Sequence, residues 1–364
     1  MKILILANND IGLYQFRREL IEELLKKNEV AIALPYGELV DPLKKMGCRF
    51  INIPVDRRGV NPFKDLKLML KYMGLLKSEV PELVVTYTIK PNIYGGMACR
   101  IRKIPYAVNI TGLGTAFQQK GFLRKLVVTL YKQGLKKADL IFFENIENRQ
   151  IFVNQGIVKE KDTCVLNGAG VNLEHYQVAE YPTEERGIRF LFIGRVMKEK
   201  GIEELFSAMQ MLQKDEIDCT LDVLGDYEED YKDKMEQYSS EGWLRYHGYQ
   251  KDVRPYIASA HCFVLPSWHE GMANTNLECA AMGRPVITSN IHGCLEAVED
   301  GTTGFLCKRK NVEELYRVMK LFSELSYEEK KQMGLYGRAR METLFDKRMI
   351  VQKTVAELYN HRRN

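Results

Sequence analysis

Short apolar runs alternate with amphipathic stretches along the first 150 residues of the chain. Six runs of about seven residues, rich in Val, Ile and Leu, predict buried strands, and they occupy residues 2–8, 29–35, 49–55, 82–88, 105–111 and 139–145. Between them, residues 14–27 and 61–78 carry apolar side chains at helical spacing. Strands that are apolar throughout are typical of a parallel sheet with helices on both faces.

The same alternation restarts after a polar segment, Tyr176 to Arg189, which contains Pro182 and Gly187 and is predicted to be a linker. Four more apolar runs predict strands, at residues 190–195, 219–226, 261–267 and 285–290. A chain of 364 residues is long for one hydrophobic core. We therefore expect the α/β fold class, with two doubly wound Rossmann-like domains in tandem.

The predicted domains are residues 1–180 and 186–345, and a C-terminal helix at about 346–364 is expected to pack back on the first domain. Ligands of such sheets bind beyond the carboxyl ends of the strands. The cleft between two facing domains is the expected site.

Charge is distributed unevenly along the chain. Residues 1–150 hold 25 Lys and Arg against 14 Asp and Glu, whereas the remainder holds 28 against 34. A basic first half favours phosphorylated ligands, nucleic acid or an anionic membrane as partners.

No apolar run approaches the roughly 20 residues of a membrane span, and the N-terminal run is too short for a signal peptide. Eight cysteines without a C-x-x-C pair indicate reduced thiols in a cytosolic protein.

The first candidate motif follows the strand predicted at 190–195. Gly194 ends this strand, and Arg195 and Lys200 precede Gly201 and a helix. A strand-end loop with two cations suits a diphosphate, because Arg offers a bidentate fork and Lys a point charge. The alternative is an ordinary solvated βα loop.

The second candidate motif, HEGMANTNLECAAMGRPV, covers His269 to Val286. Thr275 and Glu278 fit the S/T-x-x-E capping box, in which Glu278 would bond the backbone N–H of Thr275. The functional alternative uses the free N–H groups of the same helix N-terminus to hold a phosphate at the turn from Gly271 to Thr275. Glu270 and Glu278 would then accept hydrogen bonds from sugar hydroxyls.

Two further motifs lie in the first half of the chain. YTIKPNIYGG offers Lys90 and Asn92 around a proline suited to a helix start, and NITGLGTAF offers Gly112, which permits close backbone approach. Ordinary turn chemistry explains both equally well.

The stretch from Phe122 to Lys137 combines apolar residues at helical spacing with basic side chains. It is predicted either to lie on an anionic bilayer or to be a solvated domain helix. Its membrane candidates are Phe122, Arg124, Lys125, Lys132 and Lys136.

Several common motifs are missing. No G-x-G-x-x-G follows the first strand, and the chain has no P-loop, H-E-x-x-H or G-x-S-x-G sequence. These absences argue against a dinucleotide dehydrogenase. No D-x-D sequence stands out as a metal anchor for a nucleotide sugar.

Taken together, these runs resemble the family 4 glycosyltransferases, which are retaining enzymes of the GT-B fold. The most specific part is VLPSWHEGMANTNLECAAMGRPVITSNIHGCLEAVEDGTTGFL, which is similar to that family's E-x7-E region. The pieces VLGD and YHGYQKDVRPYIASA also fit. The pieces YTIKPNIYGG and NITGLGTAF look like a branch that acts on polyprenyl-diphosphate-linked sugars in capsule, O-antigen or bacterial N-glycan assembly.

The resemblance implies a role for each matching residue. Arg195 and Lys200 would neutralise the UDP diphosphate, Glu278 would hold the ribose, and Glu270 would hold the donor sugar. Gly12, in the first loop of the first domain, would approach the diphosphate from the other side. The other donor-side residues would be Gly194, Gly225, Tyr249, Gly271, Met272, Ala273, Asn274 and Thr275. The acceptor or sugar side would be Lys90, Asn92, Thr111 and Gly112.

One departure concerns Thr111-Gly112, which stands where many members carry His-Gly, so a histidine contact near the donor sugar is lost. No general base is assigned, because the family's chemistry is thought to need none from the protein. No cofactor or metal is expected.

The resulting expectation is a retaining glycosyltransferase. It would move a sugar from a UDP-sugar to a polyprenyl-diphosphate-linked saccharide on the inner face of the cell membrane, as a peripheral cytoplasmic protein. The alternatives are a transferase with a soluble acceptor, a sugar epimerase on the same fold, and a non-catalytic nucleotide-sugar-binding protein.

Overall fold

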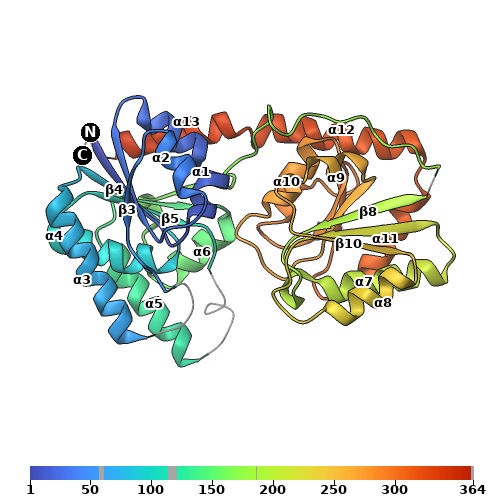
Figure 1. The fold of residues 1–364 in the computed structure, drawn as a ribbon, viewed down its shortest axis with the longest axis horizontal. Coiled ribbons are helices and arrows are strands. Elements are labelled where there is room, and N and C mark those ends of the chain that lie inside the picture. The colour runs from blue at the N-terminus through green and yellow to red at the C-terminus, as the bar shows by residue number, and fades with distance from the viewer. Residues whose placement is uncertain (57–60, 114–120, 186, 362–364) are drawn as a thin grey trace. The chain divides into compact units, whose positions relative to one another are not determined.

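The chain folds into two compact units, each built around its own parallel sheet (Figure 1). The computed structural model describes residues 1–56, 61–113, 121–185 and 187–361. The first unit consists of Met1–Ala169 and Arg348–Asn364, and the second of Gly170–Lys347. Residues 170–180 therefore belong to the second unit and not to the first domain, where the sequence analysis had placed them.

The first unit has a seven-stranded parallel sheet in the order β3-β2-β1-β4-β5-β6-β7. Its strands are β1 Lys2–Leu6, β2 Glu29–Leu34, β3 Arg49–Asn52, β4 Leu83–Tyr87, β5 Tyr106–Ile110, β6 Leu140–Phe143 and β7 Thr163–Val165. Its helices are α1 Asp10–Leu25, α2 Val40–Lys45, α3 Pro62–Glu79, the π-helix η1 Pro91–Gly95, α4 Gly96–Arg102, α5 Phe122–Leu135, α6 Ile146–Asn154, the 3₁₀ turn η3 Glu160–Asp162 and α13 Lys347–Asn360.

Both faces of this sheet are buried, as the apolar runs predict. Alternate residues of β1 point to opposite faces, so that Ile3 and Ile5 join one apolar cluster and Leu4 and Leu6 join the other. The first cluster also contains apolar side chains of α1, α2 and the C-terminal helix α13, and the second contains those of α3, α4 and α5. Asn28 Nδ2 donates to the hydroxyl of Tyr359 at 2.8 Å, which ties α13 to the first unit.

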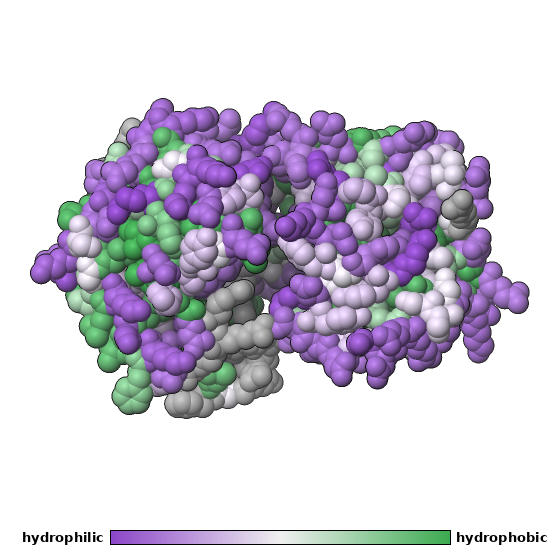
Figure 2. All heavy atoms as spheres, in the orientation of Figure 1, coloured by the Kyte–Doolittle hydropathy of each residue, from purple (hydrophilic) through white to green (hydrophobic). Residues whose placement is uncertain are grey.

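The second unit has a six-stranded parallel sheet in the order β10-β9-β8-β11-β12-β13. Its strands are β8 Ile188–Ile193, β9 Cys219–Leu224, β10 Leu244–Gly248, β11 Cys262–Leu265, β12 Val286–Ser289 and β13 Gly304–Cys307. Its helices are η4 Lys198–Lys200, α7 Ile202–Lys214, α8 Lys232–Ser240, α9 Arg254–Ser259, α10 Asn274–Ala281, η5 Leu295–Ala297, α11 Val312–Glu324 and α12 Tyr327–Leu344. One apolar cluster fills this unit. In the view of Figure 2 its surface is mostly hydrophilic.

The segment predicted to be a linker is packed on the second unit, so that prediction is wrong. The hydroxyl of Tyr181, a buried side chain, donates to the carbonyl of His261 at 2.9 Å. The buried guanidinium of Arg284 donates to the carbonyls of Ala179 and Glu180 at 3.2 and 2.6 Å. The segment is polar in composition, but Arg284 satisfies the carbonyl groups of Ala179 and Glu180, and Tyr181 contributes apolar surface. The segment therefore packs on the second unit.

Candidate active site

The carboxyl edge of the second sheet gathers the glycines that the sequence analysis placed there. Gly194 follows β8, and its backbone N–H donates to the carbonyl of Leu224 at 2.9 Å. Gly225 follows β9, and its backbone N–H donates to the carbonyl of Gly248 at 2.8 Å. Gly225 has φ +134°, and a Cβ there would lie 1.9 Å from the carbonyl oxygen of Gly194. Only glycine fits this approach. Tyr249, 56% exposed, follows β10 at the same edge.

The loop after β8 is held against the loop after β11 by close backbone packing. Gly201 adopts φ +73°, and a Cβ there would lie 2.1 Å from the carbonyl oxygen of Pro266. The backbone N–H of Trp268 donates to the carbonyl of Glu199 at 2.9 Å. These contacts bring the two predicted motifs, separated by about 70 residues in sequence, to one place on the edge of the sheet.

Lys200 and Glu270 meet at this place. The Lys200 ammonium donates to Glu270 Oε1, and the hydroxyl of the buried Ser267 donates to the same oxygen at 2.8 Å. Both charged side chains are largely buried, at 20% and 12% exposed. A partly desolvated ion pair with a supporting hydroxyl has a fixed geometry, so Glu270 orients the Lys200 ammonium.

Arg195 lies at the same strand end but is held less tightly. Its guanidinium is 3.4 Å from the Glu228 carboxylate, and its side chain is 55% exposed. Such an exposed pair contributes little to stability. Of the two predicted cations, Arg195 is therefore the one that can change partner at little cost.

His269 precedes Glu270, and the sequence analysis gave it no role. Its Nε2 is 3.5 Å from Glu199, and its buried Nδ1 has no hydrogen-bond partner among the described residues. Burial lowers the pKa of His269, so the ring is neutral at physiological pH. The signal for it in the sequence was its position directly before Glu270.

Helix α10 follows this site, and its N-terminus has no side-chain cap. The N-cap residue is Ala273, so Thr275 lies inside the first turn. The capping-box interpretation of Thr275 and Glu278 is therefore wrong. Asn276 is fully buried and donates to Thr288 Oγ1 at 3.2 Å, which fixes α10 on β12. An uncapped helix N-terminus favours an anion, and that is the functional alternative for this turn.

The residues around this turn differ in exposure. Met272 and Ala273 are buried, while Gly271, Asn274 and Thr275 are partly buried. The Oδ1 atom of Asn274 is buried and has no hydrogen-bond partner among the described residues.

Glu278 makes its contacts in the second turn of α10. The Tyr176 hydroxyl hydrogen-bonds to its carboxylate. Burial raises the pKa of Glu278 to about 7, against smaller lowering effects of the Tyr176 hydrogen bond and of Lys347. Carboxyl groups whose pKa is strongly shifted by burial are enriched at functional sites, so Glu278 stays a candidate for ligand binding.

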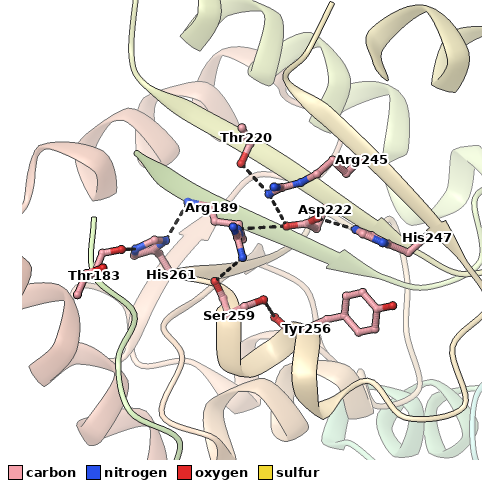
Figure 3. Close-up of polar contacts among 9 residues, drawn as sticks. All are labelled: Thr183, Arg189, Thr220, Asp222, Arg245, His247, Tyr256, Ser259 and His261. Atoms are coloured by element: carbon pink, nitrogen blue, oxygen red, sulfur yellow. Dashed lines mark hydrogen bonds and ion pairs between the residues drawn. The ribbon is translucent and has the colours of Figure 1, made fainter. Parts of the chain in front are cut away.

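A polar network that the sequence analysis did not predict lies on β8, β9 and β10 (Figure 3). The buried Asp222 on β9 accepts from Arg245 at 2.9 Å and lies 2.6 Å from His247 Nε2, both on β10. The Nε atom of Arg189 on β8 lies 3.6 Å from the Asp222 carboxylate. Two guanidinium groups compensate the buried carboxylate. The network holds the edge strand β10 against β9, and it thereby fixes the start of the loop that carries Tyr249.

In the first unit, Gly12 is not in a loop, contrary to the prediction. Asn9 caps α1, and its side chain accepts from the Gly12 N–H at 2.7 Å. The helix thus begins at Asp10, four residues earlier than the apolar pattern indicated, and the Gly12 N–H is already occupied.

The residues predicted for the acceptor side follow β4 and β5. Lys90 donates to the buried Asp65 of α3 at 2.8 Å. Asn92 is 1% exposed, accepts from Thr86 Oγ1 at 2.7 Å and donates to the carbonyl of Asn109 at 2.8 Å, so both ends of its amide are engaged internally. Thr111 and Gly112 are partly buried, and Gly112 has φ +155°.

The predicted membrane residues lie on α5 and, for Lys136, at its C-cap. Lys125, Lys132 and Lys136 are exposed, and Arg124 is partly buried. The side chain of Phe122 lies outside the described part of the structure.

Solved structures define the class of fold. The Anabaena HepE structure in complex with UDP-glucose matches with a TM-score of 0.82 at 18% identity, covering 99% of this chain and 100% of that one. A glycosyltransferase structure from Rickettsia africae matches with a TM-score of 0.81 at 18% identity over 100% and 99%. The two doubly wound units therefore form the GT-B fold, as predicted.

Family models identify the chain further. The model described as "Glycosyl transferases group 1" matches residues 177–340, and "Glycosyl transferase 4-like" matches residues 2–145. The chain belongs to these glycosyltransferases, and the prediction of a transferase enzyme is confirmed.

Curated relatives can be aligned with this chain over most of their length. N,N'-diacetylbacillosaminyl-diphospho-undecaprenol alpha-1,3-N-acetylgalactosaminyltransferase of Campylobacter jejuni is 28% identical, with 97% of each chain covered. UDP-Gal:alpha-D-GlcNAc-diphosphoundecaprenol alpha-1,3-galactosyltransferase of Escherichia coli is 26% identical, with 76% of this chain and 75% of the relative covered. CapM, a capsular polysaccharide biosynthesis glycosyltransferase of Staphylococcus aureus, is 26% identical over 93% and 92%.

Proposed function

We propose that this glycosyltransferase moves a sugar, with retention of configuration and without a metal, from a UDP-sugar to a polyprenyl-diphosphate-linked saccharide in bacterial surface polysaccharide or glycan assembly. The observation that carries the proposal is the joining of Lys200 and Glu270 at the carboxyl edge of the second sheet, beside the uncapped N-terminus of α10. Relatives named for diphospho-undecaprenol acceptors support the acceptor class.

The donor chemistry follows from the charges at this edge. When the bond between the sugar and the β-phosphate breaks, negative charge develops on UDP. The Lys200 ammonium, the Arg195 guanidinium and the free N–H groups of α10 are the groups that would stabilise it. Two side-chain cations thereby take the place that a divalent metal holds in other nucleotide-sugar enzymes.

The remaining donor contacts are assigned to groups at the same edge. Glu278 would accept from the ribose hydroxyls, the backbone of Gly271 to Ala273 would contact the donor sugar, and Tyr249 and the Gly225 turn would hold the base. Glu270, which orients Lys200 and lies in the same turn, would also contact the donor sugar.

The acceptor would come from the membrane, and the protein would bind there from the cytoplasmic face. No helix among the described residues is long and apolar enough to span a bilayer. Lys125 and Lys132 of α5, together with Lys136 at its C-cap, provide an exposed basic surface in the first unit. Anionic lipids attract such surfaces. Lys90, Thr111 and Gly112 follow the strands of the same unit and are assigned to the acceptor side.

The test is the release of UDP. Incubation with a set of UDP-sugars and a polyprenyl-diphosphate-linked monosaccharide should release UDP and extend the lipid-linked product by one sugar. UDP release only with water-soluble saccharide acceptors would replace the proposed acceptor class. Interconversion of UDP-sugars without any acceptor would replace transfer by epimerisation.

A charge prediction tests the membrane part. Replacing Lys125 and Lys132 by Gln should weaken binding to anionic vesicles by roughly 25-fold, because each lysine near such a surface contributes about 1 kcal/mol. Cosedimentation with vesicles containing phosphatidylglycerol measures this, and added salt should weaken binding of the unsubstituted protein. The affinity for UDP should stay unchanged. Equal binding to neutral and anionic vesicles would contradict the electrostatic contribution.

A further inference from the structure

Helix α3 of the first unit exposes large apolar side chains in a regular row. Phe63 is 85% exposed, Leu66 52% and Leu70 56%. Their spacing of three and four residues places them on one stripe of the helix. The opposite stripe is buried against the sheet and includes Leu68 and Tyr72. The exposed stripe is therefore additional to the one that folding uses.

A second row of side chains runs beside the first. Each exposed apolar residue is followed by a lysine, so that Lys64, Lys67 and Lys71 form a parallel stripe about 100° further round the helix. All three are exposed, Lys64 pairs with Asp56 at 3.1 Å, and Lys77 continues the basic character towards the end of the helix. The two acidic residues of α3 are engaged elsewhere: Asp65 is buried against Lys90, and Glu79 pairs with Lys2 and Arg49. The outward surface of α3 is thus apolar and cationic.

We propose that this surface of α3 binds an anionic lipid bilayer, with Phe63, Leu66 and Leu70 inserted at the boundary of headgroups and acyl chains and the lysine row on lipid phosphates. The inference rests on the proposed membrane-linked acceptor and names the surface that reaches it. A helix lying in the interface buries its apolar face by about 5–10 Å and keeps its basic face among the headgroups. Large apolar side chains beside lysines are the composition that this environment selects.

Charge favours lipid over a second copy of the chain. A two-fold contact through α3 would bring one lysine row against another, and like charges in contact cost free energy. A phosphate-bearing surface instead neutralises the row. In Figure 2 hydrophobic residues gather on the part of the first unit where Figure 1 draws α3 and α4.

Helix α5, where the sequence analysis placed the membrane contact, supplies charge but little apolar surface. Among its described side chains, Leu123 is the one large apolar residue that is exposed, at 36%. Binding through α5 alone would be electrostatic and shallow. Helix α3 adds a hydrophobic contribution to binding. Membrane binding through the two helices should therefore depend differently on salt and on lipid packing.

The orientation of α3 fits the acceptor. Phe63 lies in the first turn, which Asn61 caps, and Asp65 in the same turn contacts Lys90 and Tyr94, which follow β4. The Phe63 end of the helix is therefore next to the carboxyl edge of the first sheet, where the acceptor-side residues lie. Insertion there would place this edge at the level of the lipid phosphates, which is the level of the diphosphate of a polyprenyl-linked sugar.

Insertion is tested directly with a tryptophan. In Phe63→Trp, vesicles of phosphatidylglycerol and phosphatidylcholine should shift the added emission to shorter wavelength, and lipids brominated on the acyl chain should quench it. The natural tryptophans, Trp243 and Trp268, lie in the second unit, so the unsubstituted protein gives the background. Leu335→Trp, at a site 40% exposed on α12, is the matched control and should show neither effect. Quenching at 335 equal to that at 63 would overturn the assignment to α3.

Loss of binding is tested with glutamines, which keep helix propensity. The triple variant Phe63→Gln, Leu66→Gln, Leu70→Gln should bind anionic vesicles at least tenfold more weakly, and Leu335→Gln should bind normally. Lys67→Gln with Lys71→Gln should cost roughly 25-fold, about fivefold for each lysine. UDP affinity and melting temperature should be unchanged in all of them, since these side chains are exposed.

The same variants separate this inference from the proposed function. UDP release with a short-chain, water-soluble acceptor diphosphate should be normal in the triple variant, and release with the long-chain acceptor in vesicles should fall with vesicle binding. If the unsubstituted protein uses the vesicle acceptor and the triple variant does so equally well, α3 is not the membrane surface and the proposed function stands. If the unsubstituted protein binds no anionic vesicles, the membrane inference is overturned. If neither acceptor releases UDP, the proposed function fails.

Discussion

Replacing Lys200 by alanine is expected to lower kcat by about 10²–10³-fold, with a similar loss for Arg195→Ala. Removing one group that stabilises developing charge costs about 2.7–4 kcal/mol in the transition state. The reaction breaks the bond to UDP, and these two cations lie where its diphosphate is proposed to bind. Initial-rate measurements of UDP release at saturating donor give the change.

The two variants should differ in how they affect stability. Arg195 is exposed and pairs with Glu228 at 3.4 Å, so its removal should leave the melting temperature nearly unchanged. Lys200 is 20% exposed and pairs with Glu270, so its removal leaves a partly buried carboxylate without its cation. Lys200→Ala should therefore also lower the melting temperature, and Lys200→Arg, which keeps the charge, separates the two effects. Normal turnover in both alanine variants would refute the diphosphate assignment.

Replacing Glu278 by glutamine is expected to weaken UDP binding and at the same time to stabilise the protein above pH 7. A neutral amide is a poorer acceptor for ribose hydroxyls than a carboxylate, by about 1–2 kcal/mol, or roughly 5–30-fold in affinity. Calorimetry with UDP measures that loss. In the unsubstituted protein, affinity should fall as pH drops below about 7, where Glu278 takes up a proton. The Gln variant should not show this dependence.

The stability effect follows from the direction of the pKa shift. Burial raises the pKa of Glu278 from 4.5 to about 7, so the folded protein holds a proton between these values that the unfolded chain has lost. The free energy of unfolding therefore falls as pH rises through this window. Gln removes this cost, so the variant should be more stable by about 1–3 kcal/mol at pH 8 and similar to the unsubstituted protein at pH 4.5. Unchanged UDP affinity would show that Glu278 serves the fold alone.

The central strands of both sheets were predictable because they are buried on both faces and read as unbroken apolar runs. The strands that the sequence analysis missed, β7, β10 and β13, are all edge strands. Edge strands are covered less completely, so their residues are under less pressure to be apolar, and Arg245 and His247 on β10 are examples. Incomplete burial accounts for the missed strands β7 and β10, whereas β13 is largely buried but only four residues long.

The candidate site was predictable to the extent that it depends on topology. Residues that follow parallel strands share one edge of the sheet, so Arg195, Lys200 and Glu270 were expected together. The contact of Tyr176 with Glu278 and the network around Asp222 join side chains that are far apart in sequence, and no local pattern marks them. Gly12 and the supposed linker were misjudged for a related reason, because a single cap by Asn9 and a single guanidinium of Arg284 decided those conformations.

Because α13 completes the first unit, the order in which the chain is synthesised differs from the order in which its units can finish folding. Ile350, Val351 and Leu358 cover a face of the first sheet, yet they emerge after all of Gly170–Lys347 has been made. At about 5–20 residues per second, that interval is roughly 10–35 s. During this time the apolar face beside α1 and α2 lacks its last helix, whereas the second unit already has its whole sequence. A nascent chain stalled before residue 348 would carry a complete second unit and an unfinished first one, and the exposed face would be a binding site for chaperones.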